Sequence, residues 1–145
     1  MNEVWDKIIK GIAAVGGAIA GIFGEWSALM TILAAVMVLD YVSGVLVAIV
    51  GKSLKTEGGH LDSKVGFKGL AKKAFIICIV LLATLLDKSI GADAMVFQTA
   101  TVCYYIANEG ISVVENAGLM GLPVPNVIKK ALEQMKEKND QDRAG

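Results

Sequence analysis

The chain has little of what enzymes and metalloproteins use. Its single histidine, His60, lies in a polar stretch, so no convincing Ser-His-Asp set can form around it. Its two cysteines, Cys78 and Cys103, fall inside apolar runs, where we expect small buried side chains, and they form no Cys-x-x-Cys pair. We therefore expect no enzyme, no catalytic residue, no cofactor and no metal.

An excess of charge of one sign is also missing. Lysine plus arginine and aspartate plus glutamate number 14 each, so the formal net charge is zero. The basic residues near the middle of the chain alternate with Glu57 and Asp62 and have no aromatic residues between them. This pattern argues against nucleic-acid binding.

Apolar residues are abundant instead. They make up 54% of the chain without counting its 16 glycines, whereas ordinary soluble domains reach ~45–50% only when glycine is included. A spanning helix needs ~20 apolar residues, and helices satisfy their own backbone groups in lipid. We predict an all-α membrane protein with four or three transmembrane helices in residues 1–122, and a cytoplasmic amphipathic helix and tail in 123–145. The predicted spans are 8–23, 28–50, 70–86 and 94–114.

The first of these runs allows three interpretations. It is short and glycine-rich, so it can span the membrane, lie at the interface, or be a signal peptide cleaved near Ala18-Ile19-Ala20. Ala13, Gly17 and Gly21 recur every four residues and form a small-residue face of the kind that packs helices together. Gly44 in the second run is a further candidate packing position.

The positions of the positive charges predict the orientation. The N-terminus, the connection between the second and third runs, and the tail hold all of them except Lys88. By the positive-inside rule, both termini and the middle connection are cytoplasmic. We assign Lys64, Lys68, Lys72 and Lys73 to a cytoplasmic basic loop. This loop either fixes topology alone or also binds anionic lipid head groups.

The tail begins with a turn at Pro123 and Pro125, after which Asn126 can cap a helix. Apolar residues then recur on one helical face at Val127, Ile128, Ala131, Leu132 and Met135. Such a helix either lies on the anionic inner leaflet or packs, solvated, on the cytoplasmic end of the bundle.

Polar residues within the apolar runs are the candidate lining or gating positions. Asp40 lies 12 residues after Ala28, hence ~18 Å deep, at about the level of Tyr104 and Tyr105. A tyrosine hydroxyl could donate to its carboxylate, or Asp40 could be protonated. Glu109, beside Asn108, is placed to pair with a lysine entering the third run. These groups either join helices or line a polar path.

Several segments in order resemble the holins of phage lysis and toxin secretion. Residues 39–44 (LDYVSG) resemble an L-D-Y-[IV]-[ST]-G stretch, and residues 63–70 (SKVGFKGL) are similar to an S-K-x-G-x-K-G-[IL] stretch followed by lysine. Further similarity follows in residues 106–112 (IANEGIS), 115–118 (ENAG) and 121–125 (GLPVP).

The resemblance implies a protein that oligomerises in the cytoplasmic membrane of a bacterial host and opens lesions. Its expected partners are further copies of itself, membrane lipids, and an endolysin or an exported toxin that crosses the lesion. Three other classes fit the residues alone: a small oligomeric ion- or proton-coupled channel or transporter subunit, a membrane scaffold, and an antiholin-like regulator.

Overall fold

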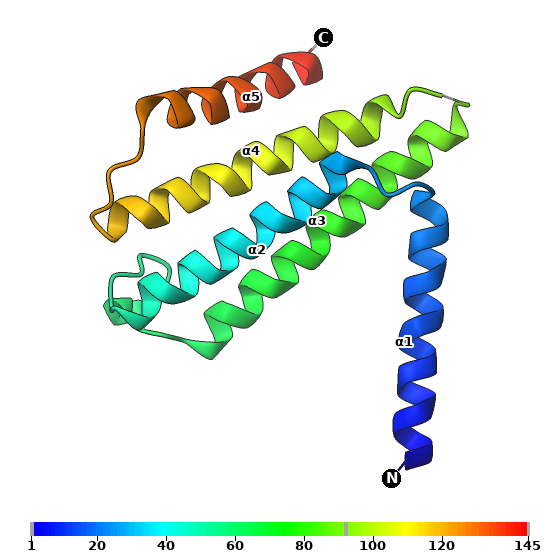
Figure 1. The fold of residues 1–145 in the computed structure, drawn as a ribbon, viewed down its shortest axis with the longest axis horizontal. Coiled ribbons are helices and arrows are strands. Elements are labelled where there is room, and N and C mark those ends of the chain that lie inside the picture. Colours follow the sequence, from blue (N-terminus) through cyan, green and yellow to red (C-terminus); the bar gives the residue numbers. More distant parts are fainter. Residues whose placement is uncertain (1, 92, 145) are drawn as a thin grey trace.

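The computed structural model describes residues 2–91 and 93–144, which form helices joined by short connections (Figure 1). The prediction of an all-α chain is confirmed. Over the described ranges, two helices, α2 and α3, are long and apolar enough to cross a membrane. The helices are α1 (Asn2–Phe23), α2 (Ala28–Ile49), the short 3-10 turn η1 (Glu57–Gly59), α3 (Ser63–Ser89), α4 (Val96–Leu119) and α5 (Asn126–Ala144).

Helix α3 begins seven residues before the predicted start at Leu70. The Asp62 carboxylate caps it by accepting hydrogen bonds from the backbone N–H groups of Lys64 at 2.7 Å and Val65 at 3.2 Å. The predicted basic loop is therefore wrong in part, because its lysines lie on the first turns of a helix. Hydropathy finds only the apolar part of a helix, and lysine is a good helix former. The reassigned lysines are Lys64, Lys68, Lys72 and Lys73.

Three helices, α2, α3 and α4, pack side by side, and α4 contacts both of the others (Figure 1). Their interface is apolar and holds the buried core residues Met30, Leu33, Met37, Ile76, Val80, Val102 and Ile106. The cysteines differ from expectation, since Cys78 is exposed and Cys103 is half-buried. An exposed apolar thiol on α3 is compatible with a lipid-facing surface.

Helix α1 extends away from this bundle (Figure 1). Its last residue, Phe23, is buried in the core, while residues 2–18 are exposed. Lys88 of α3 holds this end by donating a hydrogen bond to the backbone carbonyl of Ile22. The small-residue face is unoccupied by the described chain: Ala13 is exposed, and a Cβ built on Gly17 or Gly21 meets nothing within 4 Å.

Helix α5 runs back along α4, on the side away from α2 and α3 (Figure 1). The tail helix expected from Val127 to Met135 is thus present. Its position differs from the expected packing on the end of the bundle, because it lies on the flank of α4, and its binding to the inner leaflet stays a prediction. Leu132 and Met135 are half-buried in this position, whereas Val127 is 79% exposed. An amphipathic pattern defines an apolar face but not the surface that covers it.

Candidate functional site: a buried ionic network

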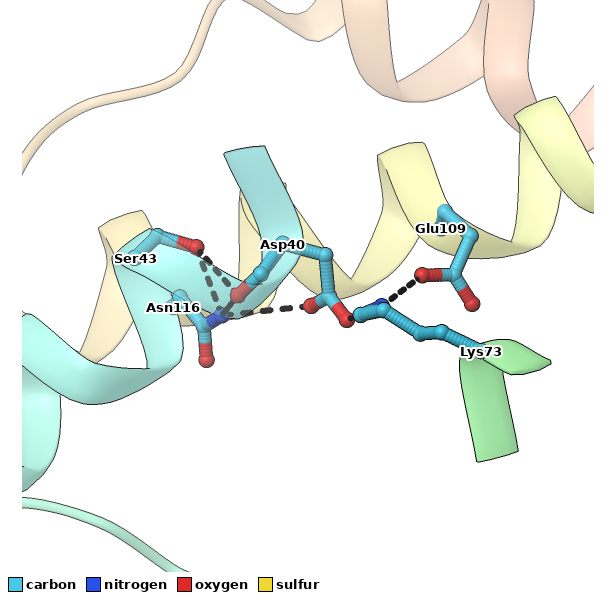
Figure 2. A network of polar contacts seen from close by, with 5 residues as sticks. All are labelled: Asp40, Ser43, Lys73, Glu109 and Asn116. Carbon is cyan, nitrogen blue, oxygen red and sulfur yellow. Dashed lines mark hydrogen bonds and ion pairs between the residues drawn. The ribbon is translucent and has the colours of Figure 1, made fainter. Parts of the chain in front are cut away.

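Three helices each bring a charged side chain to one point inside the bundle (Figure 2). Lys73 of α3 forms an ion pair with Asp40 of α2, with 2.7 Å between Nζ and Oδ2, and a second ion pair with Glu109 of α4. The residues Asp40 and Glu109 are only 9% and 5% exposed. The predicted pairing of Glu109 with a lysine of the third run is therefore confirmed.

The register of the helices explains why these residues meet. Asp40 lies nine residues before the end of α2, Glu109 lies ten before the end of α4, and Lys73 lies ten after the start of α3. At ~1.5 Å per residue, all three are ~13–15 Å from the same end of the bundle. Since α3 runs opposite to α2 and α4, the three side chains converge at one level.

Asp40 is also held by neutral groups (Figure 2). The Asn116 amide donates to Ser43 Oγ at 2.8 Å and, at 3.5 Å, to the backbone carbonyl and the carboxylate of Asp40. Ser43 Oγ donates to the Asp40 carbonyl at 3.1 Å. A Cβ built on Gly44 would lie 3.8 Å from the Asn116 amide, an ordinary van der Waals contact, so the predicted packing position lies beside the network but has room for a methyl group.

The network is unbalanced in charge, because two carboxylates share one ammonium. Ionised side chains are costly in a membrane interior unless they pair or face water. The packed bundle satisfies them only while all three helices stay together. Separation of α3 from α2 and α4 would leave both carboxylates needing water or another cation.

The sequence placed the other candidate residues less well. Counting from Ala94 put Tyr104 and Tyr105 beside Asp40, but α4 begins at Val96, and the tyrosines lie about one turn from Glu109. The Asp40 carboxylate accepts hydrogen bonds from Lys73 and Asn116. The two tyrosine rings pack edge to face, with centroids 5.2 Å apart. Asn108 is half-buried.

The predicted basic residues also separate into two kinds. Lys73 is a member of the network, and its side chain is 13% exposed. Lys64, Lys68 and Lys72 are exposed on the same helix. Sequence reasoning missed Asn116 and Ser43, since neither stands out without knowing that α2 and α4 are neighbours.

A second buried polar cluster joins α3 to α4 at the other end of the bundle. The Asp87 carboxylate, 0% exposed, accepts hydrogen bonds from the backbone N–H groups of Phe97 at 2.9 Å and Gln98 at 2.7 Å. The Gln98 amide donates to Thr84 Oγ1 at 2.7 Å. Asp87 lies just after the predicted third span, 70–86, but the structure places it on α3, where it caps the first turn of α4.

The whole arrangement is that of a small helical protein whose apolar helices enclose a charged network. Comparison with protein families makes the class specific: residues 17–137 match the model of the bacteriophage holin family. The chain belongs to the bacteriophage holin family. This family is non-enzymatic, in agreement with the prediction, and it implies the cytoplasmic membrane.

Individual relatives agree with this assignment. An uncharacterized 14.9 kDa protein of Clostridium perfringens is 34% identical over 95% of this chain and 99% of its own length. An uncharacterized protein of Halalkalibacterium halodurans is 39% identical over 90% of this chain and 96% of its own. A probable holin of Bacillus phage phi105 is 32% identical over 84% of each chain. No solved structure matches the chain.

Proposed function

We propose that this chain is a holin that accumulates in the cytoplasmic membrane of a bacterium, oligomerises, and opens lesions. Through them an endolysin reaches the cell wall, or a large toxin leaves the cell. The observation that supports this most directly is the buried ionic network, because it lies between helices that are otherwise apolar. Membership of the holin family and the likeness to a probable phage holin support it as well.

In the proposed topology, α1 to α4 all cross the membrane, and both termini face the cytoplasm. Helices α2 and α3 have the length and hydropathy of spans. Helix α4 carries more polar groups, but it buries Gln98, Glu109 and Asn116 against its neighbours. The lysines on the first turns of α3 and on α5 support this orientation through the positive-inside rule.

The proposed mechanism has a sealed state and an open state. In the sealed state, Lys73 neutralises part of the charge of Asp40 and Glu109, and the bundle presents apolar surface to lipid. Accumulation drives assembly by mass action, which supplies a threshold concentration. In the open state, the helices separate and the same carboxylates, with Asn116, line water.

The test is inducible expression in a bacterium that also makes a cytoplasmic endolysin. Culture turbidity and release of a cytoplasmic enzyme are followed together. We expect abrupt lysis after a delay, and only when both proteins are present. Intact cells despite confirmed membrane insertion would refute the proposal and favour an antiholin or a scaffold.

The buried carboxylates also favour a second candidate, a small ion- or proton-coupled channel or transporter. A buried carboxylate in a spanning helix is a common feature of ion and proton pathways. Saturable flux of small ions without leakage of proteins would identify this class in the same cells.

A further inference from the structure

Helix α5 is docked at a depth where a charged helix that faces lipid is costly. Leu132 of α5 meets α4 at Gly110, where an added Cβ would lie 2.7 Å from Leu132 Cδ2. Gly110 lies nine residues before the end of α4, hence ~13–14 Å along the helix from that end, beside Glu109 of the ionic network. The α5–α4 contact therefore lies at the level of the network.

The exposed side of α5 is strongly polar. Its charged residues outside the contact include Lys129, Lys130, Glu133, Glu137 and Lys138, all of which are exposed. Charged side chains within the hydrocarbon region are costly unless they pair or reach water. With α2 to α4 embedded, the docked position of α5 is therefore costly, and its contact with α4 opposes its release.

The contact is also incomplete, as expected of a contact that can be released. Leu132 and Met135 are half-buried, and Met135 packs against the core cluster. Val127 and Ile128, on the same apolar stripe, remain 79% and 47% exposed. Docking on α4 thus covers only part of the apolar face of α5.

The connection between the helices allows a change of position. α4 ends at Leu119, with Met120 as its C-cap, and the chain reverses at Gly121, whose φ of +78° is one that glycine adopts readily. Pro123 and Pro125 then keep the next residues out of a helix until Asn126. A rotation in this short segment moves α5 as a unit.

From these features we infer that docked α5 is a latch that holds α4 in the sealed state and must leave α4 before lesions form. The latch consists of Leu132, which packs at Gly110, and Met135, which packs against the core cluster. Undocking moves the charges of α5 to water and frees the flank of α4 for the assembled state. This inference rests on the proposed function, because it concerns how the same lesions are controlled.

The test locks the latch with a disulfide. Cys78→Ser and Cys103→Ser first remove the two native thiols from the full-length chain. Gly110→Cys is then combined with Leu132→Cys, and the second change also removes the Leu132 atoms that approach Gly110. The matched control combines Gly118→Cys with Leu132→Cys, because a Cβ on Gly118 meets nothing within 4 Å. Each purified protein is added to vesicles of phosphatidylethanolamine and phosphatidylglycerol loaded with fluorescent dextran.

We expect the Gly110/Leu132 pair to oxidise in solution and the Gly118/Leu132 pair not to. If lesions open from a minor undocked population, oxidation of the Gly110/Leu132 pair should slow dextran release roughly tenfold. A reductant should then restore the original rate of release. A disulfide that forms and leaves release unchanged would overturn the latch, as would failure of the pair to oxidise. If the untethered chain releases no dextran, the proposed function fails and the latch with it.

A second variant tests the latch without cysteines. Gly110→Leu should displace Leu132 and shorten the lysis delay in cells, because the three atoms nearest to the added Cβ all belong to Leu132. Gly118→Leu should leave the delay unchanged. An equal delay for both variants at equal protein level would overturn the latch.

Discussion

Loss of the Lys73 ammonium should destabilise the bundle far more than loss of its neighbour Lys72. In Lys73→Met, Asp40 and Glu109 keep their buried positions and lose their shared cation. Breaking a buried ion pair by removing one partner costs about 3–5 kcal/mol, because a charge is left uncompensated. The side chains of the three partners are 13%, 11% and 7% exposed, so water can offset only a small part of this cost.

The measurement is the free energy of unfolding in detergent micelles, followed by circular dichroism. Lys72→Met is the matched control, since Lys72 is adjacent, exposed and equally charged. It should stay within about 0.5 kcal/mol of the unchanged chain. In cells, Lys73→Met should also shorten the lysis delay, because the sealed packing is weakened.

A compensated variant separates charge from packing. Combining Lys73→Met with Asp40→Asn and Glu109→Gln removes all three charges together. Replacing a complete buried ionic group by neutral residues is often neutral or stabilising, so this variant should recover most of the loss. Equal stability of Lys73→Met and Lys72→Met, or no recovery in the triple variant, would refute uncompensated buried charge as the cause of the loss.

Three further outcomes follow from the same structure. Asp40→Asn should change the lysis delay without preventing membrane insertion, and an unchanged delay at equal protein level would remove Asp40 as a control point. Asp87→Ala should lower the free energy of unfolding by about 1–2 kcal/mol through loss of the α4 cap, whereas Asp93→Ala, on an exposed residue, should not. The double change Lys64→Gln and Lys68→Gln should leave topology intact when accessibility is measured from each side, because other lysines remain at that end.

Hydropathy alone was enough to locate the apolar part of the bundle. The run beginning at Ala28 became α2 with almost the predicted bounds, since Ser27 caps it and accepts from the Met30 N–H at 3.3 Å. The start of α3 was missed because Lys64 and Lys68 lower the hydropathy. The Asp62 cap marks that start in the sequence, so this error could have been avoided.

The partners within the site were harder to predict than its members. Glu109 and a lysine could be paired because both interrupt apolar runs near one end. Asn116 could not be assigned to Asp40, because that contact depends on the relative register of α2 and α4. The sequence put Tyr105 at the level of Asp40, whereas Glu109, four residues or ~6 Å further along α4, lies at that level.

The docking of α5 shows why a pattern that identifies a helix does not place it. Its apolar stripe suits a lipid surface, a bundle end or the flank of α4, and each of these buries some of the same residues. On the flank of α4, Leu132 and Met135 are half-buried while Val127 stays exposed. Docking on α4 covers only part of the apolar face of α5. The free energy difference between the docked and undocked positions therefore depends on the bilayer. The ionic network stabilises α2 to α4 in either position, so the membrane can change the position of α5 without unfolding the bundle.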